Sequence, residues 1–424
     1  MSNSEESRPQ KKRKMEESPS SSSTLSSLPD DIALKCIALT SRSDQAALSL
    51  TSKSSRSLIA SSNLYKIRSL TNHTETYVYV CLRTYIDNWY ILRRRKTLNG
   101  GSDLIPIPSL PSQPREASSV VVIDWEIYII GGLINGVPTS DVWLLDCRTH
   151  TWRIVTSMGM ARANAAAGVV DGKIYVLGGF MTDDYSCWVE VFDPKTQTWE
   201  SLPLREEDIP LPGLIHDSVV WDQKLYAVDG RERTFYYSPS ESKWGRGKGG
   251  HLAGNRRDWC MIDDLIYCVS SKGRVYWYEG KDLDWCDGDG DGEGEQEGMF
   301  SNEVKGLDSL RWRLRCSRLV HFDVHSVALW EQERIKFAYS VGRTFTRLID
   351  LLPGARLTNS GSNILLFWDV TVGLYGLEIW CAEISLKRQG VEIWGNIEWS
   401  NAVMTIDRPL TDRYKVLYSA SVTL

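Results

Sequence analysis

The sequence lacks the features that would place it in a membrane, outside the cell or on nucleic acid. No run among its 424 residues approaches the roughly 18 consecutive apolar side chains of a membrane-spanning helix, and the polar N-terminus has no apolar segment of a signal peptide. No Cys-x-x-Cys pair occurs, and nine scattered cysteines are typical of reduced, mostly buried thiols. The formal net charge of -5 provides no strong attraction for nucleic acid or acidic lipid. We therefore expect a protein of the nucleus and/or cytoplasm, with neither nucleic acid nor membrane as a partner.

Signatures of catalysis or metal binding are also scarce. No glycine-rich phosphate loop, Ser-His-Asp arrangement or paired-carboxylate motif stands out. The Asp-Gly hexad starting at Asp287 matches the first half of a calcium loop, but position 12 is Gly298 and not the required Glu. His321 and His325 have the spacing of a helical metal pair, yet their apolar neighbours indicate a strand. We expect no metal, no cofactor and no catalytic residue, and a flexible acidic loop at residues 286–298.

Residues 1–24 carry almost no apolar side chains and are predicted to be a disordered tail. The tail contains the basic run Lys11, Lys12, Arg13 and Lys14. Such a run is typical of a nuclear localisation signal, although a solubilising patch has the same composition.

Residues 25–70 change to helical periodicity. Leu28, Pro29 and two aspartates open the first helix, where proline suits the first turn and negative charge suits the helix dipole. Ile32 and later apolar residues follow at helical spacing. We expect three short helices, whose small core would gain stability from a partner.

From residue 76 the pattern becomes that of β-strands with an internal repeat. Ile127–Gly132 is repeated by Ile174–Gly179 and Leu225–Gly230, and more weakly by Leu265–Val269. Trp152, Trp199 and Trp244 recur 47 and 45 residues apart, each after an Asp-x-x-Thr-like turn. The repeats are clear over residues 118–250. Each predicts a four-stranded blade that must stack in a ring, because one blade cannot bury both faces alone.

The later chain fits this pattern less clearly. Residues 380–384 and 393–399 are predicted to be the last two strands of another blade, and residues 415–418 a strand near the C-terminus. Pairing of the two ends of the propeller in one blade would remove open edges. We therefore expect about six blades over residues 76–424. Segment 302–360 is irregular and is either one diverged blade or an insertion.

These motifs resemble a known family. Leu28-Pro29-Asp30-Asp31, Ile32 and residues 48–53 are similar to the F-box, and the paired glycines, the Tyr and the spaced Trp resemble kelch repeats. Trp380–Ile384 followed by Glu392–Gly395 is similar to the ending of plant F-box/kelch-repeat proteins. The resemblance covers roughly residues 27–403 and implies a mainly β fold, a kelch-type propeller preceded by a small all-α F-box module.

The resemblance implies a non-catalytic substrate receptor of a Skp–cullin–F-box ubiquitin ligase. The F-box would dock a Skp-type adaptor, and through it a cullin, while the propeller would bind an unknown target protein. Ubiquitin transfer would be accelerated because the target is held near the transferring enzyme, and not because residues of this chain act on a bond. The residues expected at the adaptor contact are Leu28, Pro29, Ile32, Leu48 and Leu50. The residues expected at the target-binding rim, just before the innermost strands, are Arg115, Arg162, Asn164, His216 and Arg256.

Two alternatives accompany this hypothesis. Ser55 stands where the family usually has a large aromatic residue, so the chain is alternatively a kelch scaffold with a decayed F-box and no ligase role. A propeller enzyme is the other alternative. A kelch-type copper oxidase would need clustered Tyr and His residues and an exported chain, and six unclustered histidines argue against it.

Overall fold

The computed structural model describes residues 28–83, 88–94, 102–108, 117–134, 137–179, 188–202, 215–229, 234–247, 259–270, 273–283, 302–317, 355–372, 376–407 and 415–424. The chain divides into two compact units between Thr74 and Glu75. Among the described residues, no helix has the length and apolar character needed to cross a bilayer.

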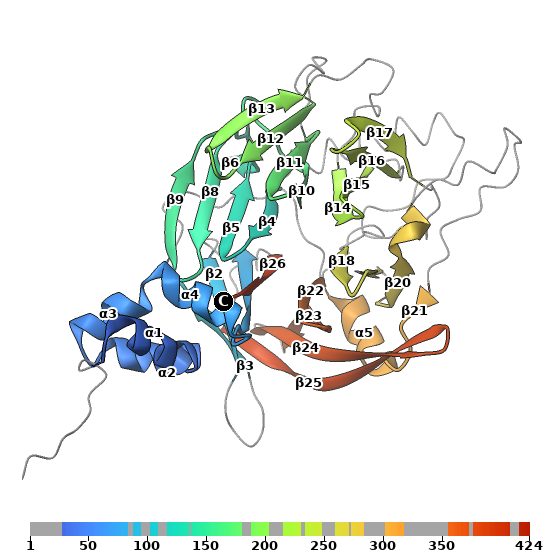
Figure 1. Ribbon diagram of the computed structural model, residues 1–424. Helices are drawn as coiled ribbons and strands as arrows, with labels where there is room; N and C mark the ends of the chain where they lie inside the picture. Colours follow the sequence, from blue (N-terminus) through green and yellow to red (C-terminus); the bar gives the residue numbers. More distant parts are fainter. Residues whose placement is uncertain are drawn as a thin grey trace, which may run out of the picture. The chain divides into compact units, whose positions relative to one another are not determined.

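The first unit consists of four short helices (Figure 1), α1 (Asp30–Ala38), α2 (Arg42–Ser49), α3 (Lys53–Ile59) and α4 (Ser62–Leu70). Serine side chains cap the N-termini of α2, α3 and α4 by accepting a backbone N–H of the first turn. The sequence predicted three helices, and the apolar run around Leu64 forms the fourth.

Two buried polar side chains close the C-terminus of α1. Arg68 donates to the carbonyls of Ala38 at 3.2 Å and of Thr40 at 2.7 Å. The Gln45 amide donates to the carbonyls of Ile37 and Thr40, both at 3.2 Å. These bonds satisfy helix-end carbonyls that have no partner within α1, so the small core depends on polar contacts as well as apolar packing.

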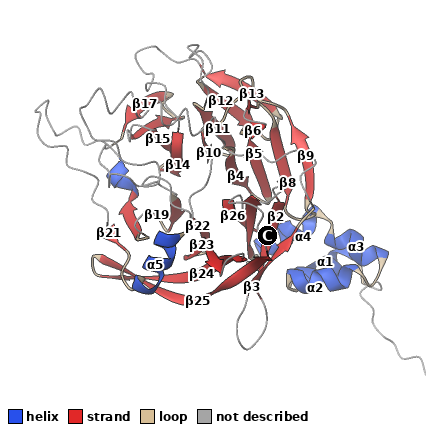
Figure 2. Cartoon of the chain, turned by 180° about the vertical axis from the view of Figure 1, so that it is seen from behind, coloured by secondary structure: helices blue, strands red, loops and turns tan. Residues whose placement is uncertain are grey.

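The second unit is a six-bladed β-propeller, which confirms the predicted fold and blade number (Figures 1 and 2). Each blade is one four-stranded antiparallel sheet. Blade 1 contains β26 (Lys415–Thr423), β1 (Thr76–Arg83), β2 (Asn88–Arg94) and β3 (Ser102–Pro106); blade 2 contains β4 (Ser119–Ile123), β5 (Glu126–Ile130), β8 (Val142–Asp146) and β9 (Thr151–Val155); blade 3 contains β10 (Ala166–Val170), β11 (Lys173–Leu177), β12 (Val189–Asp193) and β13 (Thr198–Leu202). Blade 4 contains β14 (Ile215–Trp221), β15 (Lys224–Asp229), β16 (Thr234–Ser238) and β17 (Lys243–Arg246); blade 5 contains β18 (Cys260–Ile262), β19 (Leu265–Val269), β20 (Val275–Glu279) and β21 (Asn302–Glu303); blade 6 contains β22 (Arg356–Ser360), β23 (Asn363–Val372), β24 (Gly376–Gln389) and β25 (Glu392–Asp407). A small ribbon, β6 (Leu133–Ile134) with β7 (Val137–Pro138), extends blade 2.

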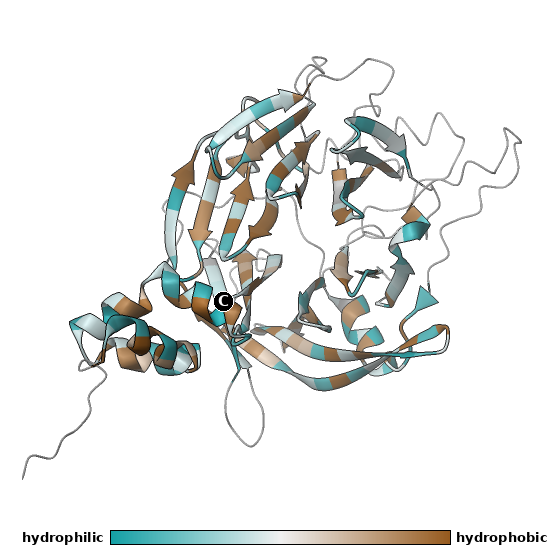
Figure 3. Cartoon of the chain, viewed as in Figure 1, coloured by the Kyte–Doolittle hydropathy of each residue, from teal (hydrophilic) through white to brown (hydrophobic). Residues whose placement is uncertain are grey.

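The ring closes in blade 1, as predicted from the strand patterns at the two ends. There β26 pairs with β1, and Glu75 N–H donates to the carbonyl of Leu424 at 2.8 Å. Buried apolar clusters join blades 2 and 3, 3 and 4, 4 and 5, 5 and 6, and 6 and 1. Blades 1 and 2 are joined by hydrogen bonds, including Tyr79 Oη to the carbonyl of Cys147 at 3.1 Å. Figure 3 shows the corresponding apolar residues along the strands.

The irregular segment 302–360 contributes to two blades, so it is not one diverged blade; the chain between β21 and β22 is a long insertion between blades 5 and 6, the other predicted possibility. β21 completes blade 5, and β22 begins blade 6. Between them lies α5 (Asp308–Cys316), and residues 318–354 lie outside the described part.

Candidate functional site

An exposed apolar stripe lies on the side of α1 opposite its buried face. Ala33 and Ile37 are fully buried in the helical core. The full buried arc of α1 consists of Ala33, Leu34, Ile37 and Ala38. At 100° per residue its centre lies about 170° from Ile32 and about 130° from Cys36, so these two residues point away from the core. Ile32 is 39% exposed, and Leu28, just before the helix, is 38% exposed. Because α1 has one buried and one exposed apolar side, its exposed stripe is suited to bind a partner.

The other predicted adaptor-contact residues lie at the first turn of α1 and at the end of α2. Pro29 precedes α1, and its carbonyl accepts from the N–H groups of Ile32 and Ala33, both at 3.0 Å. Leu48 is half-buried, whereas Leu50, the residue after α2, is 79% exposed. All five predicted residues are therefore described, and only Leu48 has an intermediate exposure.

Ser55, the departure from the family pattern, is buried in α3. Its backbone N–H donates to Ser52 Oγ at 3.0 Å, and the two hydroxyls are 2.8 Å apart. The local chain therefore satisfies this polar side chain, where the family pattern has a large aromatic side chain.

The paired glycines explain how one blade packs on the next. Gly131 has φ +60°, and a Cβ there would lie 2.4 Å from the carbonyl oxygen of Arg162. The N–H of Gly132 donates to that same oxygen at 2.8 Å. The segment entering blade 3 therefore lies directly against the second strand of blade 2, where no side chain fits.

Arg162 corrects the prediction of an exposed arginine rim. It is 1% exposed and forms an ion pair of 2.9 Å with Glu190, which is equally buried. Arg162 also donates to the carbonyls of Gly178 at 2.5 Å and Trp188 at 3.3 Å. Glu190 accepts the N–H groups of Gly159 at 2.5 Å and of Met160 at 3.3 Å. The Arg162 side chain therefore fixes the segment that leads into β10 of blade 3. Because it is buried, it cannot contact a target.

The remaining predicted rim residues are only partly described. Asn164 is half-buried with φ +52°, and its N–H donates to the carbonyl of Ala117 at 2.7 Å. His216 is in β14, but its side chain is outside the described part. Arg115 and Arg256 also lie outside it, as do the basic run at Lys11, the Asp-Gly hexad at Asp287 and the pair His321 and His325.

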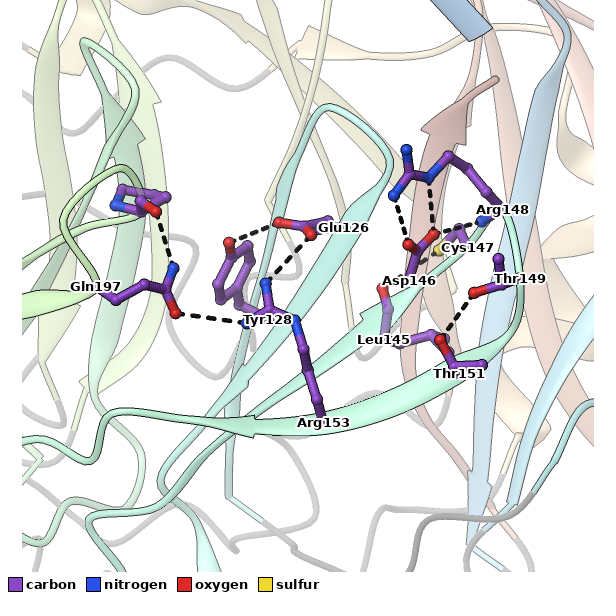
Figure 4. Close-up of polar contacts among 11 residues, drawn as sticks. Glu126, Tyr128, Leu145, Asp146, Cys147, Arg148, Thr149, Thr151, Arg153 and Gln197 are labelled. Atoms are coloured by element: carbon purple, nitrogen blue, oxygen red, sulfur yellow. Dashed lines mark hydrogen bonds and ion pairs between the residues drawn. The ribbon is translucent and has the colours of Figure 1, made fainter. Parts of the chain in front are cut away.

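The Asp-x-x-Thr turns are held by short-range polar contacts (Figure 4). Asp146 accepts the backbone N–H of Arg148 at 2.9 Å and its guanidinium at 2.6 Å. Burial alone would raise the pKa of Asp146, but these hydrogen bonds outweigh it and lower the pKa below its usual value. The hydroxyls of Thr149 and Thr151 are 2.8 Å apart. Blade 3 repeats the motif, which makes it a structural signature of this propeller.

Polar contacts near these turns also connect neighbouring blades. Arg153 of blade 2 donates at 3.4 Å to two side chains, that of Glu126 in its own blade and that of Gln197 in blade 3 (Figure 4). The indole of Trp199 donates to the carbonyl of Thr156 at 2.7 Å. The indole of Trp152 likewise donates to the carbonyl of Pro108 at 2.9 Å, so these two tryptophans connect the outer strands of blades 2 and 3 to the preceding blade.

A hollow of about 720 Å³ opens on the face where the first strands of blades 4 and 5 end. Its walls include Trp221 and the Glu279 carboxylate, which pairs with Lys281 at 2.5 Å and Arg388 at 3.2 Å. Asn164 precedes a first strand, so it is on the opposite face. No group of three or more metal-ligand side chains occurs within the described ranges.

The helical unit with its exposed apolar stripe and the kelch-type propeller together define a protein of the F-box substrate-adaptor type. An F-box domain model matches residues 25–67, and a model described as "FKB95, Kelch-repeats domain" matches residues 89–337, more than half of the chain. The chain belongs to the F-box/kelch-repeat family.

Curated relatives from Arabidopsis thaliana support this membership. The putative F-box/kelch-repeat protein At3g24610 is 39% identical over 97% of this chain and 96% of its own length. The F-box/kelch-repeat protein At4g39240 is 33% identical over 93% of this chain and 91% of its own length.

Sequence reasoning missed one exposed feature of the propeller. Helix α5 presents several arginines and a tryptophan to solvent, in the segment that showed no repeat. Leu310 and Leu314, four residues apart and both buried, were the available signal of an amphipathic helix.

Proposed function

We propose that this chain is the substrate-recognition subunit of a Skp–cullin–F-box ubiquitin ligase. The helical unit docks a Skp-type adaptor and through it a cullin, and the propeller binds a target protein. The chain itself is not an enzyme in this scheme, because a separate ubiquitin-charged enzyme acts on the lysines of the bound target. Proximity supplies the acceleration.

The exposed apolar stripe of α1 is the observation that carries the adaptor contact. Leu28 and Ile32 expose more than a third of their surface beside a core that is already filled by the opposite face. Covering such side chains removes apolar area from water, at roughly 25 cal/mol per Å². A partner on this stripe would therefore also stabilise the marginal helical core.

A pull-down with a recombinant Skp-type adaptor tests the proposal. The full chain should bind, and Leu28→Ala/Pro29→Ala should weaken binding by about tenfold or more, as expected for a contact at an interface centre. Leu70→Ala is the matched control, because Leu70 is an exposed leucine of the same unit at the end of α4. Circular dichroism and thermal melting of each variant establish that the helices remain folded.

The outcomes separate the two non-catalytic functions. Binding that survives Leu28→Ala/Pro29→Ala contradicts the proposed contact. An unmodified chain that fails to bind the adaptor contradicts the ligase role and favours a kelch scaffold whose F-box has decayed at Ser55.

We further propose that the target docks on the propeller face where the first strands begin, which includes Asn164. The proposed location is the nucleus and/or cytoplasm, with Lys11–Lys14 as a nuclear signal. A fluorescent fusion in which these four residues are changed to alanine should shift from the nucleus toward the cytoplasm. An unchanged distribution contradicts the signal.

A further inference from the structure

Helix α5 is the one α-helix among the described residues of the propeller unit (Figure 2). Its buried side consists of Leu310 and Leu314, which join the apolar cluster between blades 5 and 6. Its solvent side consists of Arg311, Trp312, Arg313 and Arg315, all exposed. We call these four residues the α5 face.

The helix is anchored to both neighbouring blades. A Cβ on Gly273, in the connection from β19 to β20 of blade 5, would lie 2.2 Å from the carbonyl oxygen of Arg311. In blade 6, Ser317 Oγ donates to the Asp369 carboxylate on β23 at 2.6 Å. Contacts on both sides hold the helix in place, so its outer side chains are presented from a rigid support.

The α5 face lies on the same side of the propeller as Asn164. The helix follows β21, the outermost strand of blade 5, and packs toward the end of β23. In an antiparallel blade, the end of the second strand, the end of the fourth and the start of the first lie on one side. Asn164 precedes the first strand of blade 3, so both features are on the proposed target-binding side.

The arginines of the α5 face are oriented but form no ion pair within the described ranges. The guanidinium of Arg313 lies 5.1 Å from the centre of the Trp380 ring, and that of Arg315 lies 5.8 Å from the Trp312 ring. The carboxylates nearby have other partners: Glu303 pairs with Arg274, and Glu378 accepts the indole N–H of Trp380. Asp308 is the one carboxylate on α5 itself, so the helix presents an excess of positive charge.

Trp312 is 68% exposed, which is unusual because a large apolar side chain is more stable when it is buried than in contact with water. Trp and Arg are the residues most enriched where protein interfaces derive their binding energy. The guanidinium group also matches a carboxylate in a two-pronged hydrogen bond. An apolar anchor ringed by arginines therefore complements a segment that combines carboxylates with an apolar side chain.

We propose that the α5 face is a docking site for an acidic segment of the target protein, with an apolar side chain of that segment packed on Trp312. This inference rests on the proposed target-binding role of the propeller and names the chemical class of the target. It replaces the buried Arg162 as the source of positive charge on this side.

Fluorescence anisotropy with the full chain tests the proposal. The probe is a fluorescein-labelled 15-residue peptide of Asp, Glu and Leu, and its counterpart carries Asn and Gln in place of the acids. Arg311→Gln/Arg313→Gln/Arg315→Gln should weaken binding of the acidic probe by about tenfold or more, and Trp312→Ala by about tenfold. The neutral counterpart should bind weakly to every variant. Added salt should weaken binding of the acidic probe, because it screens the charges.

A matched control removes the same charge elsewhere. Lys195→Gln/Lys243→Gln/Arg246→Gln changes three exposed basic side chains on blades 3 and 4, and this variant should bind within about twofold of wild type. An equal loss in this variant shows non-specific attraction and overturns the proposal. So does wild-type binding in the α5 triple variant, failure of the unmodified chain to bind the acidic probe, or tighter binding of a single-stranded DNA oligonucleotide than of the peptide.

The same variants in the adaptor pull-down separate this inference from the ligase proposal. The α5 variants should bind the Skp-type adaptor as wild type does. If the unmodified chain binds the acidic probe through α5 but binds no adaptor, the docking site stands and the ligase role fails. If the adaptor binds but α5 substitution leaves the probe unaffected, the ligase role stands and the docking site fails.

Discussion

Breaking the buried ion pair between Arg162 and Glu190 should destabilise the propeller strongly. Arg162→Met leaves the Glu190 carboxylate, 1% exposed, with only the N–H groups of Gly159 and Met160. Glu190→Met leaves the guanidinium without its carboxylate, although it still donates to the carbonyls of Gly178 and Trp188. Removal of one partner from a buried pair costs about 3–5 kcal/mol, because an uncompensated charge remains. Either substitution would therefore remove much of the free energy of unfolding, which is roughly 5–15 kcal/mol for a typical folded domain.

The double variant Arg162→Met/Glu190→Met should be much less damaging than the two single changes added together. Both charges are then gone. What remains is the loss of partners for the N–H groups of Gly159 and Met160 and for the carbonyl of Gly178, and each part of this loss is already present in one of the single variants. The coupling between the two positions should therefore amount to several kcal/mol of opposite sign to the single effects.

Urea unfolding followed by tryptophan fluorescence measures the cycle. Hydrogen exchange of Gly132 adds a local measurement, because its N–H donates to the carbonyl of Arg162 and should lose protection in both single variants. Single variants within about 1 kcal/mol of wild type, or a double variant equal to the sum of the singles, would refute the assignment of Arg162 as a buried clamp. The folded double variant should also bind the acidic probe like wild type, whereas a target-binding Arg162 requires a loss.

Three further changes test the packing account. Gly131→Ala should lower the free energy of unfolding more than Gly172→Ala, because both glycines have positive φ but only a Cβ at Gly131 meets backbone. The control Gly172→Ala should lose only about 1–2 kcal/mol in urea unfolding, from left-handed strain. Equal losses in the two variants contradict the close approach at Gly131. Trp199→Phe should cost about 1 kcal/mol by losing the bond to Thr156, and an unchanged urea midpoint contradicts this. Burial raises the pKa of Tyr267 from 10.0 to about 12, so its stabilising contribution is complete below pH 10 and is lost as pH rises toward 12. Tyr267→Phe should make the alkaline decline of stability shallower by about 2–3 kcal/mol over that range, and parallel pH profiles refute it.

The repeats made the propeller predictable, because each of blades 2, 3 and 4 carries more than one repeated motif over residues 118–250. The paired glycines and the spaced tryptophans appear in register, and each has a packing reason that does not depend on distant residues. The closing strand was predictable from the strand pattern near residues 415–418, since a ring must remove its open edges. The first turn of α1 was predictable from Leu28 and Pro29 for a similar local reason.

The environment of Arg162 was not predictable from the same patterns. Its carboxylate partner lies 28 residues away on another strand, and burial of both depends on how blades 2 and 3 stack. An arginine before a strand has the same local sequence whether it faces solvent or a neighbouring blade. The α5 face escaped prediction for the opposite reason, because a helix that interrupts a repeat has no second copy with which to align.

These two cases indicate where recognition resides in a propeller of this kind. A side chain that recurs in register is held on both sides by neighbouring blades, so its chemistry is used to stack the ring, as Arg162 and Trp199 are. A side chain in a break of the repeat has no such duty and is free to vary without loss of the scaffold. The arginines and Trp312 of α5 are such side chains, since the buried Leu310 and Leu314 anchor the helix while the arginines and Trp312 are exposed. Specificity for the target should therefore depend on the interruptions between blades more than on the repeated residues.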